Sequence, residues 1–174
     1  LYQIAGGDTV QVDQTARQLT ALGVEIDILL SNDVINYQKY DLLHFFHITR
    51  SAAILHHIKS ANVPFVVSTI FCTYGNYYKY SSEGIGLVFR GLSEDSKDYL
   101  RTVGRWLLGR EQLPNINYLW TGQRKTIIEV LKTANFILPN SQSELKRLED
   151  NYDCKPKSII VTNGINPEKF PFDH

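Results

Sequence analysis

The stretch that decides the fold runs from Thr133 to Phe170 and reads TANFILPNSQSELKRLEDNYDCKPKSIIVTNGINPEKF. Near its start lies an apolar run of strand length, Phe136-Ile137-Leu138. Ser141 then stands where a helix needs a side-chain oxygen for its first amides, and Glu144 follows three residues later. Ser-x-x-Glu is a capping box. We therefore expect a strand followed by a helix that begins at Ser141.

The second half of this stretch returns to an apolar run. Leu145, Leu148 and Tyr152 continue the helix at helical spacing, and Pro156 ends it. Residues 159–161 are Ile-Ile-Val, and an Asn-Gly turn follows them. The stretch predicts a strand, helix and strand unit, for which a right-handed crossover is the expected geometry.

The rest of the chain alternates in the same way. We expect further strands at residues 24–30, 41–47 and 65–70, and helices at 10–22, 51–61, 93–107 and 121–133. Ser51 is the expected N-cap of the second helix. The predicted fold class is α/β, a doubly wound and mainly parallel sheet with helices on both faces.

A resemblance to a known family rests on the same stretch. Asn140-Ser141-x-Ser143-Glu144, followed by Val161-Thr162-Asn163-Gly164-Ile165-Asn166 and then Phe170, resembles the end of the N-terminal domain of GT-B glycosyltransferases of retaining family 4. The resemblance implies that residues 1–174 are one Rossmann-like, acceptor-side domain that ends at the interdomain linker, with its first strand truncated. A parallel α/β domain with a capped helix and an Asn-Gly turn is the plainer alternative.

The same resemblance implies an activity for the intact enzyme. It would transfer a sugar from a nucleotide-sugar donor to a glycan or lipid-linked acceptor, with retention of configuration and without a metal or other cofactor. The donor clamp of that family lies in a second domain, so we expect this chain alone to be inactive or nearly so. A non-catalytic module of flavodoxin-like or response-regulator type is the second function class.

The composition of the chain limits its possible binding partners and cellular setting. Eighteen basic residues balance eighteen acidic ones, so no net field favours nucleic acid. Cys72 and Cys154 cannot form a disulfide framework or a paired zinc site, which favours a reducing, cytoplasmic setting. No apolar run approaches the roughly 20 residues of a membrane span.

The first candidate site is a glycine loop, Gly6-Gly7-Asp8-Thr9, ahead of the first helix. Amides at a helix start suit a diphosphate, and in the resembled family this loop faces the cleft between domains. The alternative is that Asp8 already caps those amides and, as a carboxylate, repels phosphate.

The second candidate site lies at the ends of the expected strands, where ligands gather in open α/β sheets. It contains His47 and Arg50 after one strand, Thr69 in the next, and Ser141 with Glu144 after a third. His44 is a core histidine on this interpretation.

Phe71 stands where the family often has a catalytic histidine, so no catalytic residue is assigned. Tyr74 opens a long loop of tyrosine, serine, asparagine and glycine over residues 72–92. Such residues stack on sugars and form hydrogen bonds with them, and long loops are either functional or disordered.

Lys97, Arg101 and Arg105 recur four residues apart and form a basic stripe on an expected helix. The usual explanation is a solvated face. The functional alternative is contact with anionic headgroups or a lipid-diphosphate acceptor, which would place the protein at the inner face of a membrane.

Overall fold

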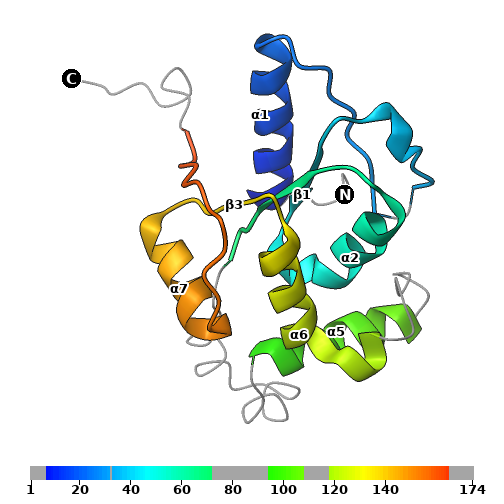
Figure 1. Ribbon diagram of the computed structural model, residues 1–174, viewed down its shortest axis with the longest axis vertical. Helices are drawn as coiled ribbons and strands as arrows, with labels where there is room; N and C mark the ends of the chain where they lie inside the picture. Colours follow the sequence, from blue (N-terminus) through cyan, green and yellow to red (C-terminus); the bar gives the residue numbers. More distant parts are fainter. Residues whose placement is uncertain (1–6, 32, 72–93, 108–117, 165–174) are drawn as a thin grey trace.

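The computed structural model describes residues 7–31, 33–71, 94–107 and 118–164. These residues form a parallel sheet of three strands in the order β1-β2-β3, with bounds β1 Leu43–Phe46, β2 Phe65–Ser68 and β3 Phe136–Leu138. The helices are α1 Gly7–Ala21, α2 Ser51–Ser60, α5 Glu94–Leu107, α6 Tyr118–Thr133 and α7 Gln142–Tyr152, with 3-10 turns at Tyr37–Lys39 and Ile48–Arg50. Helix α1 lies on one side of the sheet, and α2 and α6 lie on the other (Figure 1). The predicted doubly wound, Rossmann-like α/β class is confirmed.

The strand register gives the sheet two different faces. Phe45, Val67 and Ile137 are aligned across the three strands, and so are Phe46, Ser68 and Leu138 on the neighbouring rung. Because side chains alternate along a strand, the two sets point to opposite faces. The first set belongs to or packs against the apolar core.

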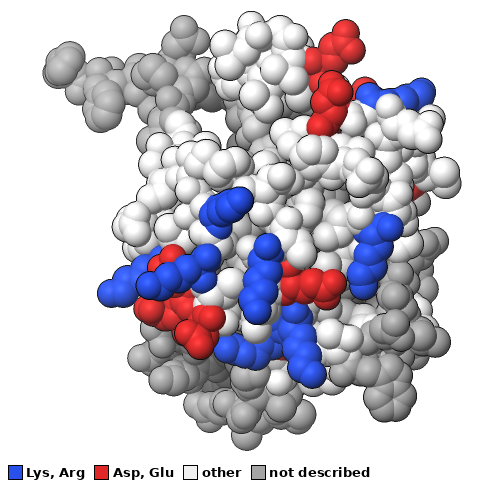
Figure 2. Space-filling model, viewed as in Figure 1, with Lys and Arg blue, Asp and Glu red and all other residues white. Residues whose placement is uncertain are grey.

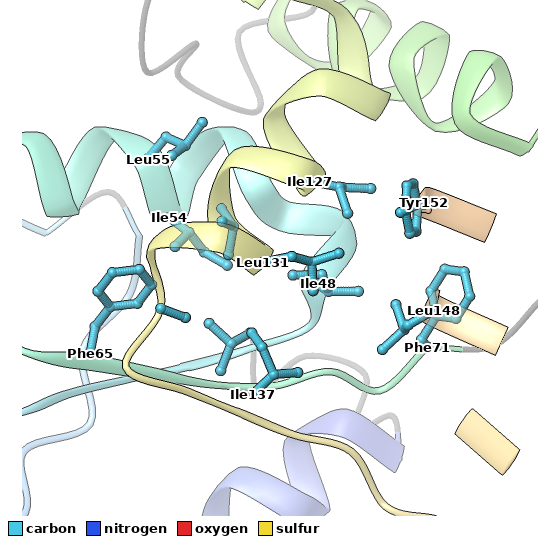
Figure 3. Close-up of a cluster of buried hydrophobic side chains, with 13 residues drawn as sticks. Ile48, Ile54, Leu55, Phe65, Phe71, Ile127, Leu131, Ile137, Leu148 and Tyr152 are labelled. Carbon is cyan, nitrogen blue, oxygen red and sulfur yellow. The ribbon is translucent and has the colours of Figure 1, made fainter. Parts of the chain in front are cut away.

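That core fills the space between the sheet and the helices α2 and α6 (Figure 3). Ile48, Ile54, Ile127 and Ile137 are each at most 1% exposed. Burial of such a side chain contributes roughly 1.5–3 kcal/mol, so this layer supplies most of the packing energy of the described residues.

The predicted capped helix is confirmed as α7. Ser141 has extended backbone angles, and its hydroxyl accepts a hydrogen bond from the Glu144 amide at 3.2 Å. Leu145 and Leu148 face the interior of the protein. The helix ends earlier than expected, because Asp153 adopts the left-handed conformation (φ 48°) three residues before Pro156.

Two predicted strands differ from the structure. Residues 24–30 form no strand, and all seven side chains are exposed. Residues 159–161 lie beside β3, since the Ile159 amide donates to the Ile137 carbonyl, but only one isolated bridge forms there. The second run is bonded to the chain of β3 again where the Val161 amide donates to the Pro139 carbonyl at 2.9 Å, whereas no described strand pairs with residues 24–30, although their composition favours a strand.

The predicted N-cap at Ser51 is also wrong, as is the alternative N-cap at Asp8. Helix α1 begins at Gly7, so Asp8 is its second residue. Ser51 is the first residue of α2, which continues directly from the 3-10 turn, and its hydroxyl lies 2.8 Å from that of Thr126 in α6. The α6 helix contains a non-helical residue, Gly122 (φ 73°), so its regular part follows that glycine.

Candidate functional site

The candidate site is the edge of the sheet where the three parallel strands end. His47 follows β1, Thr69 follows β2, and Asn140 lies two residues beyond β3. The Gln11 amide nitrogen donates to the Asn140 side-chain oxygen at 3.2 Å, which holds the first turns of α1 at this same edge. His47, Thr69 and Ser141 therefore lie at this edge together with the first turns of α1, whereas no regular strand forms at residues 159–161 and Gly6 lies outside the described residues.

Two residues at this edge have a left-handed backbone that is unfavourable for them. His47 has φ 75° directly after β1, and Ile70 has φ 42° just after the neighbouring strand β2. A β-branched residue is rarely found there, and such strain costs on the order of 1–3 kcal/mol per residue. Strained residues of this kind cluster at ligand-binding positions, which supports this edge as the site.

A polar chain behind His47 fixes the turn after β1. The His47 ring nitrogen Nδ1 lies 2.8 Å from the Thr49 hydroxyl. Gln123 donates to the Thr49 carbonyl at 2.6 Å and accepts from the buried Tyr118 hydroxyl at 2.5 Å. The kink at Gly122 brings Gln123 to the start of the regular helix, so α6 orients the loop that carries the imidazole.

Glu144 joins the ends of β2 and β3. Its Oε1 accepts from the Thr69 hydroxyl at 2.5 Å and from the Phe71 amide at 2.6 Å, while Oε2 accepts from the Asn140 amide at 2.7 Å. The side chain is 4% exposed. In a simple capping box this carboxylate would accept the amide of Ser141, whereas here it accepts the amide of Asn140 and reaches the residues that follow β2.

The predicted site residues fall into three groups. Arg50 is exposed at the end of its 3-10 turn, and Thr9 and His47 are half-buried. Thr69, Phe71 and Glu144 are buried in contact with one another. Gly6 and Tyr74, with the whole 72–92 loop, lie outside the described residues.

Two other histidines have lowered pKa values. Burial lowers the pKa of His44 to about 4, and its Nε2 lies 2.9 Å from the Ser68 hydroxyl. Burial, and then the neighbouring His56, lower the pKa of His57, whose Nδ1 lies 2.9 Å from the Tyr37 hydroxyl. Both rings pack against phenylalanines, as expected of histidines that serve as core residues.

A hollow among the described residues lies elsewhere. Its volume is about 330 Å³, and it lies between the middle of α1 and the exposed run after that helix; the lining residues are Asp13, Ala16, Arg17, Thr20, Ile26 and Ile28. The exposed Arg17 pairs with Asp13 at 3.1 Å along the helix. No strand end and no strained residue lies there, so the chemistry favours the sheet edge over this hollow.

Charges on the described surface are mixed. Figure 2 shows Lys and Arg interspersed with Asp and Glu over the part of this face where α6 and α7 lie. Lys125 of α6 and Lys146 of α7 are exposed, and Lys59 pairs with Glu129 at 3.9 Å. Because positive and negative side chains alternate, the described part of this face has no continuous basic stripe that would bind the phosphate backbone of a nucleic acid.

Neither a metal centre nor a membrane span is found in the described part. There, no group of three or more His, Cys, Asp or Glu side chains could hold a metal ion. None of its helices is long and apolar enough to cross a bilayer. No protein-family model, no curated protein and no solved structure matches the chain.

Three residues at the edge were not predicted from the sequence. Gln11 and Asn140 pair across 129 positions, and no local pattern indicates such a contact. Ile70 has a left-handed backbone, which glycine or asparagine at that position would have predicted and isoleucine does not. The position of Asn140, directly after Pro139 at a strand end, was the signal that could have marked it.

Proposed function

We propose that this chain is the acceptor-side domain of a retaining GT-B glycosyltransferase of family 4. The observation that carries the proposal is the meeting of α1, the three strand ends and α7 at one edge, with Gln11 bonded to Asn140 within the family-like motif. In open α/β sheets this edge is where ligands bind. The motif resemblance supplies the reaction: transfer of a sugar from a nucleotide-sugar donor to a glycan or lipid-linked acceptor.

In this proposal the described residues bind and orient the acceptor. We expect His47, whose Nδ1 lies 2.8 Å from the Thr49 hydroxyl, to form a hydrogen bond with an acceptor hydroxyl, and the exposed Arg50 to add a positive charge nearby. The donor diphosphate is held by the second domain of the family. Orientation of two bound reactants is a large contribution to such a transfer, so neither half is expected to be active alone.

The alternative, a flavodoxin-like or response-regulator-like module, shares the α/β fold but is not favoured by the residues at the strand ends. The response-regulator class needs a phosphoacceptor carboxylate with partner acids at the strand ends. In the described part of the chain this edge carries Glu144, whose two oxygens are already bonded to Thr69, Phe71 and Asn140.

The test is glycosyl transfer by the longer protein of which this chain would be a part. We expect it to release nucleoside diphosphate from one member of a panel of UDP-, GDP- and ADP-sugars when an acceptor extract is present. His47→Ala should lower kcat/KM at least about tenfold, because loss of an orienting hydrogen bond weakens transition-state binding. His56→Ala, an exposed histidine of α2, is the matched control and should be neutral. Absence of release with every donor would contradict the proposal.

A lipid-linked acceptor would add a membrane contact at the cytoplasmic face. Lys97, Arg101 and Arg105 lie in α5 at intervals of four residues, and their side chains are outside the described set. A joint change of the three to serine should reduce sedimentation with phosphatidylglycerol vesicles, since each basic residue near an anionic surface contributes about 1 kcal/mol. Lys125, Lys132 and Lys146 changed together provide a control of equal charge.

A further inference from the structure

The loop that carries His47 is tied to α6 by a buried glutamine. Gln123 is 3% exposed, and its side-chain nitrogen donates to the Thr49 carbonyl at 2.6 Å. Its side-chain oxygen accepts from the Tyr118 hydroxyl at 2.5 Å. Because a carbonyl oxygen only accepts hydrogen bonds, the amide nitrogen must face Thr49 and the amide oxygen must face Tyr118. Both ends of the buried amide are therefore bonded, and its orientation is defined.

A second link joins the same turn of α6 to the same loop. The Thr126 hydroxyl donates to the Gln123 carbonyl at 2.8 Å, and it lies 2.8 Å from the Ser51 hydroxyl, from which it can accept. The side chains of Ser51 and Thr126 are at most 4% exposed. The residues on both sides of the exposed Arg50 are thus held by α6, which fixes the helix turn that carries Gln123.

The imidazole of His47 depends on this anchoring through Thr49. The His47 ring nitrogen Nδ1 lies 2.8 Å from the Thr49 hydroxyl, and His47 itself has φ 75° and ψ 94°. A residue keeps such an uncommon backbone only where its surroundings hold it. On the sheet side, the His47 amide donates to the Ser68 carbonyl at 2.9 Å, and toward α6 the turn is held at Thr49 by Gln123. The place of the Thr49 hydroxyl beside the ring therefore depends on Gln123.

We propose that Gln123 is a positioning residue: by holding the Thr49 carbonyl, it keeps the Thr49 hydroxyl at Nδ1 of His47 and fixes the tautomer of the imidazole. A hydrogen bond at one ring nitrogen determines which nitrogen carries the proton of the neutral ring. The other nitrogen, Nε2, then has one defined character, donor or acceptor. That this ring meets an acceptor hydroxyl rests on the proposed function, whereas its control by Gln123 follows from the contacts of the side chains.

The test is proton–nitrogen NMR of the histidine rings of the 174-residue chain at about pH 8, above the usual pKa of an imidazole. In the wild-type protein the nitrogen shifts of His47 should show one predominant tautomer. Gln123→Met keeps the length of the side chain and removes its amide. In this variant the ratio of the two tautomers should fall by about fivefold, as expected for the loss of one hydrogen bond.

The matched control is Thr126→Val, in the same turn of α6. This variant breaks the buried bond to Ser51 and leaves the bond between Gln123 and Thr49 in place. It should destabilise the fold and leave the His47 ring unchanged, which separates positioning from a merely structural role. Tyr118→Phe removes only the hydroxyl that orients the Gln123 amide, so it should change the tautomer ratio in the same direction as Gln123→Met, by a smaller factor.

Several outcomes would overturn the proposal. An even mixture of tautomers in the wild-type protein would do so without any variant, which covers the case in which Gln123→Met fails to fold. A folded Gln123→Met with the wild-type ratio would do so, as would an equal change in Thr126→Val. Absence of glycosyl transfer by the longer protein would remove the role of the ring toward an acceptor and leave the NMR result intact.

Discussion

The two faces of the sheet are built differently. Under α2 and α6 lie side chains such as Ile48, Val67 and Ile137, each fully buried. On the α1 side lie His44 and Ser68, joined by a hydrogen bond, and the 41% exposed Phe136. None of the described side chains of α1 is fully buried. The first face supplies apolar packing, and the second depends more on polar pairs.

The difference continues beyond the strands. Five apolar residues in the run after α1 are between 36% and 45% exposed: Val24, Ile26, Ile28, Leu29 and Leu30. Similar residues on the other face are nearly inaccessible. We infer that stability and site geometry come mainly from the layer of α2, α6 and α7, and that the α1 layer contributes less.

The largest expected effect is in the core layer. Ile137→Ala should lower the free energy of unfolding by about 3–4 kcal/mol, because it removes buried methyl groups and leaves a cavity under α6. Ile28→Ala, an exposed isoleucine on the α1 side, should cost less than about 1 kcal/mol. Urea denaturation measures both, and equal losses would show that the two faces do not differ as described.

A smaller effect is expected where the core layer meets the site. Glu144→Ala should cost about 2 kcal/mol, because it leaves the buried Thr69 hydroxyl and the Phe71 amide without their acceptor. Hydrogen exchange should accelerate first at the Phe71 and Asn140 amides. Glu149→Ala on the same helix should change neither exchange nor stability much, and similar results for both variants would contradict the role given to Glu144.

On the α1 side, stability should depend on pH. The pKa of His44 is lowered from 6.5 to about 4 in the folded protein, so between these values the unfolded chain binds more protons. Stability should therefore fall as pH decreases from about 6.5 to 4, by about 2 kcal/mol, since the ring is not fully shielded from water. His57 adds to this slope in the same direction. His44→Gln should flatten the pH dependence in urea denaturation; an unchanged slope would mean that His44 does not titrate in this way.

The smallest effect concerns the end of α7. Asp153 has φ 48°, so Asp153→Gly should stabilise by about 0.5 kcal/mol through relief of the left-handed conformation. Asp150→Gly, within the helix, should instead destabilise by about 0.3 kcal/mol, the difference between Asp and Gly in helix propensity. In thermal unfolding the melting temperature should rise for Asp153→Gly and fall for Asp150→Gly. A lower melting temperature for both variants would argue against a left-handed end at Asp153.

Local signals predicted the parts of the fold that local chemistry controls. Ser141 and Glu144, three residues apart, identified α7, and the apolar runs at residues 65–70 and 136–138 identified β2 and β3. The run at residues 24–30 has the composition of a strand, yet composition does not say whether a partner strand pairs with it. Asp8 and Ser51 are residue types that often cap helices. However, α1 begins one residue before Asp8, and α2 begins at Ser51 itself.

The candidate site was predicted only in outline. Parallel strands end at one edge, so His47, Thr69 and Ser141 could be placed together from the order of elements alone. The bond between Gln11 and Asn140 and the reach of Glu144 to Thr69 join residues 129 and 75 positions apart, and depend on the packed structure. The left-handed backbone conformation of Ile70 likewise could not be predicted from the residues around it.

The central claim is that this chain holds the acceptor and lacks the donor clamp. Calorimetric titration of the 174-residue chain with UDP-, GDP- and ADP-sugars tests it most directly. We expect no binding tighter than about 1 mM, which corresponds to about 4 kcal/mol, because in this proposal the second domain holds the donor diphosphate. A micromolar Kd for any of these donors would contradict the claim and the assignment of domain roles behind it.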